Sequence, residues 1–322
     1  MRDGGRQSHG RARRARAAPP RQQGTRLTAK RVRNGEKQMT AKVAFLGLGV
    51  MGFPMAGHLK ARGHDVTVFN RTAARSEAWV QKHGGQSAAT PAGAARGADF
   101  VAMCVGNDRD LAEVAAAALD GMKKGAVLID HTTASADAAR GLYEAARERG
   151  VDFIDAPVSG GQAGAESGKL SIMCGGDAAA FERARPVMEC YGRAVTRMGA
   201  AGAGQLTKMV NQICIAGLVQ GLSEGVAFAE KAGLDPLLVL DVISKGAAQS
   251  WQMENRGKTM AARKFDFGFA VDWMRKDLGI CLDEARRNGA LLPVTALVDQ
   301  FYADVQQDGG SRWDSSSLIT RL

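Results

Sequence analysis

The sequence contains no CxxC pair, no clustered histidines and no uninterrupted apolar run of membrane length. Its five cysteines are scattered along 322 residues, which is typical of small buried thiols in a reducing compartment rather than of a disulfide framework. The five histidines give no metal-ligand spacing. The sequence therefore predicts no metal site and no membrane partner, and it favours a cytoplasmic location.

Excess charge is absent from most of the chain. The net charge of +10 arises in residues 1–38, where twelve Arg and Lys stand against two acids, whereas the remaining residues carry 31 basic and 31 acidic side chains. The tail has few apolar residues, so we expect it to be disordered. We interpret it as translated upstream sequence before a start at Met39. A transit peptide or a nucleic-acid-binding arm is the alternative, and a nucleic-acid partner is not expected.

Residues 39–203 alternate apolar, strand-like runs with helix-like stretches. The runs are KVAFLGLG, DVTVFN, GADFVAMCV, GAVLIDHTT, VDFIDAPVSG, LSIMCGG and AVTRMG. This alternation predicts an α/β fold, a Rossmann-type doubly wound and mostly parallel sheet with helices on both faces. Residues 204–322 show long helical patterns instead, so we expect an all-α second domain joined to the first by a long helix that reaches about Lys231.

A stripe of glycines marks that long helix. Gly217, Gly221 and Gly225 recur every four residues and so fall on one helix face. A face without side chains lets another helix approach closely. The partner is either a helix of the same chain or a second subunit, and the sequence leaves both open.

The motif GLGVMG directly follows the first apolar run and opens a helix. Its glycines have the G-x-G-x-x-G spacing, which permits a tight turn and brings the backbone close to a pyrophosphate at the helix N-terminus. We therefore predict dinucleotide binding by the whole motif, which consists of Gly47, Leu48, Gly49, Val50, Met51 and Gly52.

The second strand-like run ends in Asn70, Arg71 and Thr72. An NAD-specific site usually has an acidic side chain at this point to hold the ribose 2′-hydroxyl. A carboxylate would repel a 2′-phosphate, whereas guanidinium, amide and hydroxyl groups hydrogen-bond it. The sequence therefore favours NADP(H) over NAD(H), although Arg71 stacking on the adenine would leave both cofactors open.

Lys208 is the only charged residue between Met198 and Ser223. Burying an ammonium group in such an apolar helix costs several kcal/mol unless the group finds partners or loses its proton. The side chain either reaches water or takes part in chemistry. Asn211 lies three residues further on, hence on the same helix face.

Ser159, Gly160 and Gly161 follow the run VDFIDAPV. Consecutive amides in a glycine-rich turn, together with a hydroxyl group, suit a carboxylate. A purely structural turn is the alternative.

Four ordered segments give the chain a family resemblance from about residue 42 to its end. They are GLGVMGFPMAGHL, DAPVSGGQAGAESGKLSIM, GAGQLTKMVNQ and KDL at Lys276–Leu278. The chain resembles the β-hydroxyacid dehydrogenase family, which includes 3-hydroxyisobutyrate dehydrogenases, tartronate semialdehyde (2-hydroxy-3-oxopropionate) reductases and glyoxylate/succinic semialdehyde reductases. The resemblance implies an NAD(P)-dependent oxidoreductase that acts on a short carboxylate-bearing substrate and assembles as a homodimer or homotetramer.

The resemblance also implies residue roles. Lys208 matches the catalytic lysine, which would act as general acid and base while a hydride moves between cofactor and substrate. The substrate-binding positions are Thr133, Ser159, Gly160, Gly161, Asn211 and Gln212. Cys104, Val105, Thr133 and Lys276 match positions along the cofactor.

Two positions depart from the family pattern. His58 stands where an Asn is common, and Gln212 follows Asn211 where 3-hydroxyisobutyrate dehydrogenases carry a second Asn. The Asn-Gln pair resembles the 2-hydroxy-3-oxopropionate reductases instead, so both substrates stay open. The alternatives to this function are an imine reductase-like enzyme and a non-catalytic cofactor-binding protein whose basic tail binds nucleic acid.

Overall fold

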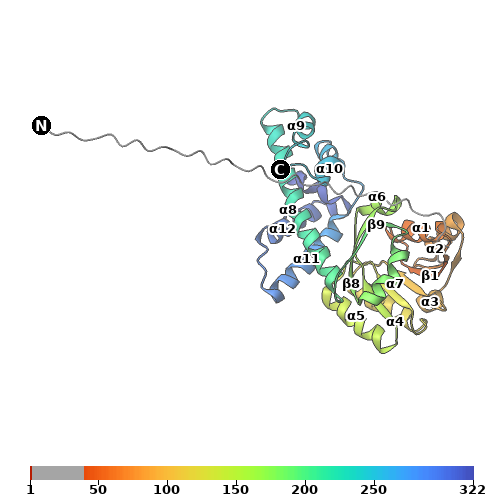
Figure 1. Ribbon diagram of the computed structural model, residues 1–322. Coiled ribbons are helices and arrows are strands. Elements are labelled where there is room, and N and C mark those ends of the chain that lie inside the picture. Colours follow the sequence, from red (N-terminus) through yellow and green to blue (C-terminus); the bar gives the residue numbers. More distant parts are fainter. Residues whose placement is uncertain (2–39) are drawn as a thin grey trace. The chain divides into compact units, whose positions relative to one another are not determined.

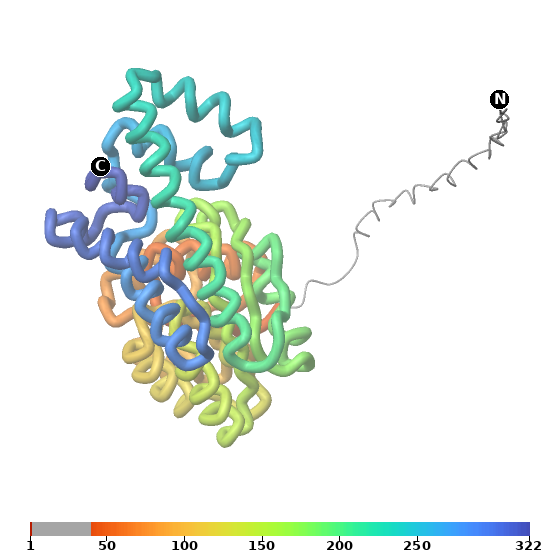
Figure 2. The backbone as a smooth tube through the Cα atoms, turned by 90° about the vertical axis from the view of Figure 1, so that its left-hand side faces the viewer, coloured from red at the N-terminus to blue at the C-terminus, as the bar shows by residue number. Residues whose placement is uncertain are grey.

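The structure, a computed structural model, describes Met1 and residues 40–322, and residues 40–322 form one compact unit. The predictions for the tail therefore fall outside the described residues. Within the unit, the strands and the first helices form one part, and the later helices gather around the long helix α8 (Figures 1 and 2). The predicted domain boundary at residues 203 and 204 lies at the start of that helix and stays a prediction.

The first part alternates strands with helices. Its strands are β1 (Lys42–Leu46), β2 (Asp65–Phe69), β3 (Gln86–Ser87), β4 (Phe100–Met103), β5 (Val127–Asp130), β6 (Asp152–Asp155), β7 (Val158–Ser159), β8 (Leu170–Gly176) and β9 (Gly192–Gly199). Its helices are α1 (Gly52–Ala61), α2 (Ala73–His83), α3 (Pro91–Ala95), α4 (Asp108–Leu119), α5 (Ala136–Glu148), α6 (Gly161–Glu166) and α7 (Ala178–Met188).

The second part is helical. It contains α8 (Ala203–Lys231), α9 (Pro236–Ile243), α10 (Trp251–Ala261), α11 (Val271–Asn288), α12 (Pro293–Gln307) and the 3₁₀ helices η1 (Gly310–Arg312) and η2 (Ser315–Arg321). The expected end of the long helix near Lys231 agrees with α8. Asp235 caps α9 by accepting a hydrogen bond from the Leu237 amide, with Pro236 in the first turn.

All strands belong to one nine-stranded sheet with the order β3-β2-β1-β4-β5-β6-β8-β7, and β9 pairs with β8. The strands from β3 to β6 run parallel, whereas β8 is antiparallel to β6 and β7. The predicted α/β fold with a mostly parallel sheet is confirmed. The two-residue strands β3 and β7 were not anticipated, because such short segments show no recognisable alternation.

Apolar side chains are buried on both faces of the sheet. In β1, Val43 and Phe45 belong to one hydrophobic cluster, and Ala44 and Leu46 belong to the other. A strand covered by helices on both faces gains from apolar residues at every buried position, which explains the apolar run VAFL after the exposed Lys42.

Two side chains attach the start of α8 to the carboxyl ends of the parallel strands. Asp155, the last residue of β6, accepts hydrogen bonds from the amides of Gly202 at 2.8 Å and Gln205 at 3.0 Å. The side chain of Gln205 donates to the Thr132 carbonyl at 2.7 Å and accepts from the Ala134 amide at 3.0 Å. The first turn of α8 therefore lies directly over the edge where β5 and β6 end.

Helix α8 is also long and apolar enough, by length and composition, to cross a membrane. Half of its most apolar 18-residue window is buried inside the protein, where α8 packs against α10, α11 and α12. The core helix of a globular protein has the same properties, so this finding alone is weak support for a membrane span.

We expect Gly204→Ala to destabilise the fold. A Cβ atom at Gly204 would lie 2.4 Å from the Met173 carbonyl oxygen and 2.6 Å from the Asp155 carbonyl oxygen. Both atoms belong to strand backbone, so the loss should be about 1–3 kcal/mol. Thermal and urea unfolding measure it.

Gly141→Ala in α5 is the matched control, because a Cβ at this helical glycine would have nothing within 4 Å. It should raise the free energy of unfolding by about 0.5–1 kcal/mol. Equal melting temperatures for the two variants would contradict the close approach of α8 to the sheet.

Candidate active site at the carboxyl ends of the parallel strands

The glycine turn after β1 is closed on its inner side and open on its outer side. Gly47 has a φ of +94°, and a Cβ there would lie 2.3 Å from the Cys104 carbonyl oxygen. A Cβ at Gly52 would lie 1.9 Å from the Gly47 carbonyl oxygen. Gly49, in contrast, has nothing within 4 Å of its Cβ position, so its backbone faces open space. The turn fits the close approach of a dinucleotide pyrophosphate.

Helix α1 leaves its N-terminal amides without a side-chain partner. Met51 at the N-cap makes no capping hydrogen bond, and the first turn of α1 contains no acidic side chain. The Phe53 amide donates to the Gly49 carbonyl at 3.1 Å and Pro54 has no N–H, so the attraction for an anion at this end comes mainly from the helix dipole. Val50 and Met51 contribute backbone to this end of the turn.

The three residues after β2 have different surroundings. Asn70 braces the glycine turn, because its Oδ1 accepts from the Leu48 amide at 2.9 Å and its Nδ2 donates to the Thr72 carbonyl at 3.1 Å. The Arg71 side chain is 84% exposed and lies 3.5 Å from Asp110. Thr72 occupies the N-cap of α2 without a side-chain hydrogen bond.

Arg75 was missed by the sequence reasoning. Its guanidinium donates to the Leu48 carbonyl at 3.1 Å, which places a second cation at the glycine turn. The sequence did contain a signal for this contact, namely a basic side chain in the first turn of α2.

The residues after β4 and β5 lie next to each other. Val105, which follows Cys104, donates its amide to the Thr132 hydroxyl at 3.0 Å. Burial raises the pKa of the Cys104 thiol to about 12, so this thiol stays protonated at neutral pH. Burial also raises the pKa of Asp130 to about 7, and its Oδ2 is buried without a hydrogen-bond partner. The structure thus brings Thr133 beside the Cys104–Val105 segment.

Lys208 is buried, with only 7% of its surface exposed. Burial lowers the pKa of its amine, the negative charge of Asp277 opposes this shift, and the positive charge of Lys276 adds to it. The side chain lies one turn beyond Gln205, which is attached to the Thr132 carbonyl. Lys208 therefore belongs to the same edge of the sheet as Thr133.

A chain of hydrogen bonds joins the predicted substrate residues. The Ser159 hydroxyl donates to Asn211 Oδ1 at 3.2 Å, and Asn211 Nδ2 donates to Gln212 Oε1 at 2.8 Å. Gln212 Nε2 donates to Asp277 Oδ2 at 2.6 Å. The chain connects β7 with α8 and α11, segments that lie more than fifty residues apart in the sequence.

Lys276 of α11 is a second lysine at this site. Its ammonium group donates to the Thr133 carbonyl and lies 3.0 Å from Asp277 Oδ1. This contact is an ion pair without hydrogen-bond geometry, so Asp277 Oδ1 accepts no hydrogen bond from residues 40–322. Asp277 was given no role by the sequence reasoning, although it stands inside the quoted KDL motif.

The glycine turn beside Ser159 requires glycine at both positions. Gly160 has a φ of +130° and Gly161 a φ of +61°, which side chains rarely adopt. His58, the other departure from the family pattern, has its Nε2 within 3.0 Å of the Ala165 carbonyl oxygen. This contact links α1 to α6.

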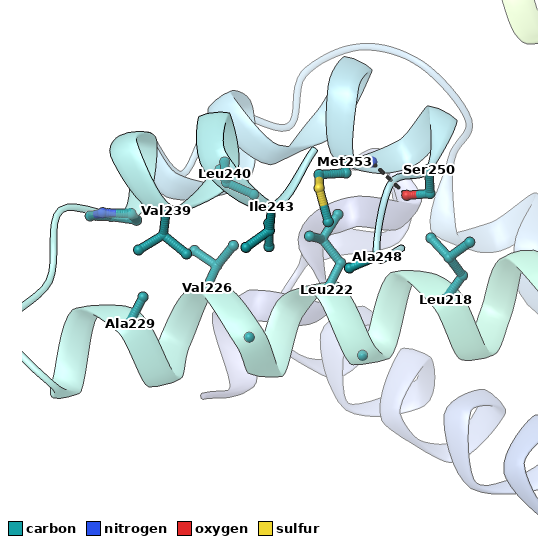
Figure 3. A pocket seen from close by; sticks show the side chains of 13 residues that line it. Leu218, Leu222, Val226, Ala229, Val239, Leu240, Ile243, Ala248, Ser250 and Met253 are labelled. Carbon is teal, nitrogen blue, oxygen red and sulfur yellow. Dashed lines mark hydrogen bonds between the residues drawn. The ribbon is translucent and has the colours of Figure 1, made fainter. Parts of the chain in front are cut away.

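A separate apolar cavity of about 280 Å³ lies between α8, α9 and α10 (Figure 3). Leu222 and Val226 of α8 face Leu240 of α9 and Met253 of α10 across it. None of the predicted site residues lines this cavity. It is therefore separate from the residues around Lys208.

Comparison with known proteins decides the family. A family model described as the NAD binding domain of 6-phosphogluconate dehydrogenase matches residues 42–199. A second model, described as NAD-binding of NADP-dependent 3-hydroxyisobutyrate dehydrogenase, matches residues 202–322. An uncharacterized oxidoreductase of Shewanella frigidimarina (strain NCIMB 400) is 63% identical over 285 residues, which are 88% of this chain and 98% of the relative. The chain belongs to the β-hydroxyacid dehydrogenase family.

Two further members of this family bear on function. The 2-hydroxy-3-oxopropionate reductase of Escherichia coli (strain K12) is 35% identical over 87% of this chain and 97% of its own length. The solved Mycobacterium tuberculosis 3-hydroxyisobutyrate dehydrogenase with L-serine is 31% identical, with a TM-score of 0.81 over 88% of this chain and 99% of that one.

Membership of the β-hydroxyacid dehydrogenase family makes this chain an NAD(P)-dependent oxidoreductase of hydroxyacids with a nicotinamide cofactor. The non-catalytic alternative is therefore not retained. Among residues 40–322, no group of three or more His, Cys, Asp or Glu side chains is placed to hold a metal ion.

Proposed function

We propose that this enzyme interconverts a short β-hydroxyacid and the corresponding semialdehyde, with Lys208 as general acid and base. The observation that supports it is the burial of Lys208 near the strand ends, beside the Ser159–Asn211–Gln212 chain of hydrogen bonds. When bound, the nicotinamide supplies or accepts the hydride.

The lysine has two tasks in this proposal. During reduction its ammonium form stabilises the negative charge that develops on the carbonyl oxygen and donates a proton to it. During oxidation the neutral amine accepts the hydroxyl proton. Burial lowers the pKa of Lys208 and so favours the neutral amine, whereas the charge of Asp277 opposes this shift and favours the ammonium form.

The charges of the site support a carboxylate substrate. Lys276 lies 3.0 Å from Asp277 Oδ1, and the charges of both residues act on the amine of Lys208. Two lysines close to one site favour an anionic substrate. Ser159, Gly160, Gly161 and Asn211 supply hydroxyl, backbone and amide donors of the kind that hold a carboxylate.

The substrate that we propose is 2-hydroxy-3-oxopropionate or 3-hydroxyisobutyrate. The Escherichia coli relative is named as a reductase of the first compound, and the Mycobacterium tuberculosis relative is named as a dehydrogenase of the second. Asn211-Gln212 favours the first compound. The test is a panel of 2-hydroxy-3-oxopropionate, succinic semialdehyde, glyoxylate, 3-hydroxyisobutyrate and L-serine, each assayed with both nicotinamide cofactors.

Lys208→Ala should lower kcat with the best substrate of that panel by about 10²- to 10⁴-fold, because the proton then has no donor or acceptor. Cofactor binding, measured by quenching of protein fluorescence, should persist, since the glycine turn is untouched. Lys231→Ala, at the exposed far end of the same helix, is the control and should retain full activity. Undiminished turnover by Lys208→Ala would refute the mechanism.

We further propose that NADP(H) is preferred. Arg71 and Arg75 lie after β2, where the exposed Arg71 guanidinium has only a 3.5 Å contact with Asp110 to exchange for a 2′-phosphate, and Asn70 supplies no negative charge. Arg71→Ala should raise KM for NADPH by about 10- to 100-fold and leave KM for NADH nearly unchanged. Steady-state kinetics with both cofactors measures this, with the exposed Arg96→Ala as control. Equal losses with both cofactors would contradict a 2′-phosphate contact.

We also propose that the protein forms a homodimer or homotetramer through α8 and α9. Gly221 and Gly225 line the apolar cavity between α8, α9 and α10, and among residues 40–322 nothing lies within 4 Å of their Cβ positions. Leu238 and Val242, on the helix whose Val239 and Ile243 also line the cavity, are each 62% exposed. A two-fold contact between two copies of the chain would bury these apolar groups together.

Sedimentation should therefore give a multiple of 34.0 kDa for the wild type. The double variant Leu238→Asp/Val242→Asp should shift the mass toward one chain, whereas Leu291→Asp, which is 91% exposed elsewhere, should not. A monomeric wild type, or one that sediments with lipid vesicles, would refute self-association through this face.

We propose a cytoplasmic location on the basis of the five free cysteines, and cell fractionation tests it.

A further inference from the structure

Asp277 is the one buried carboxylate that contacts the hydrogen-bond chain of the site. It lies on α11, is only 2% exposed, and contacts Gln212 of α8 and its own neighbour Lys276. The mechanism proposed above uses the charge of Asp277 near Lys208 but assigns no role to its contact with Gln212.

A carboxylate can only accept hydrogen bonds, whereas a carboxamide can be turned either way. Asp277 therefore requires Gln212 to present its NH₂ group, and the oxygen of Gln212 then faces Asn211. That oxygen requires the NH₂ group of Asn211, so the oxygen of Asn211 faces the Ser159 hydroxyl. One buried charge thus sets the direction of all three hydrogen bonds.

The direction matters for a carboxylate substrate. The Asn211 NH₂ group has two hydrogens, and its bond to Gln212 uses one of them. The second remains as a donor. If the two amides were reversed, the oxygen of Asn211 would face Gln212 and its NH₂ group would face Ser159, so the spare N–H would occupy a different position in the site.

We propose that Asp277 is a positioning residue that acts through Gln212 to fix the orientation of Asn211, so that Asn211 offers an N–H donor to the substrate carboxylate. This inference rests on the proposed function. The same carboxylate also favours the protonated form of Lys208, because it faces both Lys208 and Lys276.

Three variants test the direction of the chain. Asp277→Asn removes the fixed acceptor and lets both amides turn, so KM for the carboxylate substrate should rise by about tenfold or more. In the double variant Asp277→Asn/Gln212→Glu, the new carboxylate at residue 212 accepts from residue 277 and from Asn211. The original direction and the charge are then restored, and KM should return most of the way. Asp283→Asn on the exposed side of α11 is the control.

The pH profile gives a second readout. Asp277 raises the pKa of Lys208, so its removal should shift the alkaline limb of the reductive rate to lower pH. The double variant should reverse part of this shift. A residue that only supported the fold would lower activity without moving the limb, and the charge-restoring change would bring no recovery.

A third readout does not depend on turnover. Calorimetric titration of 3-hydroxyisobutyrate into protein with NADPH present should show weaker binding for Asp277→Asn and recovery in the double variant. The methyl ester, which lacks the carboxylate, should not distinguish the three proteins. Equal affinities of wild type and Asp277→Asn for the acid would overturn the inference while leaving the role of Lys208 intact. A wild type that binds no hydroxyacid would overturn both.

Discussion

The attachment of α8 to the sheet is the constraint on which the site depends. Asp155 at the end of β6 accepts two amides from the first turn of α8, and Gln205 reaches back to the loop after β5. Removing the buried Asp155 from water raises its pKa, and the helix amides oppose that rise. These hydrogen bonds fix the start of α8 against the sheet, and Lys208 follows one helical turn after Gln205.

The charges near Lys208 oppose one another. Burial and the positive charge of Lys276 lower the pKa of its amine, and the negative charge of Asp277 raises it. In the function proposed above, an anionic substrate would compensate the positive charge of the two lysines, whereas an uncharged carbonyl compound would not.

Much of the fold could be predicted because it depends on local patterns. The continuous apolar run of β1 and the glycine spacing of residues 47–52 each specify their structure within a few residues. The end of α8 near Lys231 and the start of α9 at Pro236 were visible for the same reason. The strands β3 and β7 were missed because two residues show no periodicity.

Contacts between distant segments of the site could not be predicted from the residues alone. Gln212 meets Asp277 across 65 residues, and Ser159 meets Asn211 across 52. Nothing in the spacing of these residues indicates that they share one chain of hydrogen bonds, and the family resemblance marked the separate positions without their connections. Asp155 was likewise invisible as a helix cap, since it precedes the capped amides by almost fifty residues.

The sequence left two possible partners for the glycine stripe of α8, a helix of the same chain or a second subunit. Gly217 has Val294 of the same chain at 3.6 Å from its Cβ position, but Gly221 and Gly225 have nothing within 4 Å. Within residues 40–322, the last two glycines line the cavity opposite α9 and α10 without a direct contact at their Cβ positions. They lie at least thirteen residues beyond Lys208, about 20 Å along a helix. A subunit contact at this face, as proposed above, would therefore leave the hydrogen bonds in the first turns of α8 unchanged.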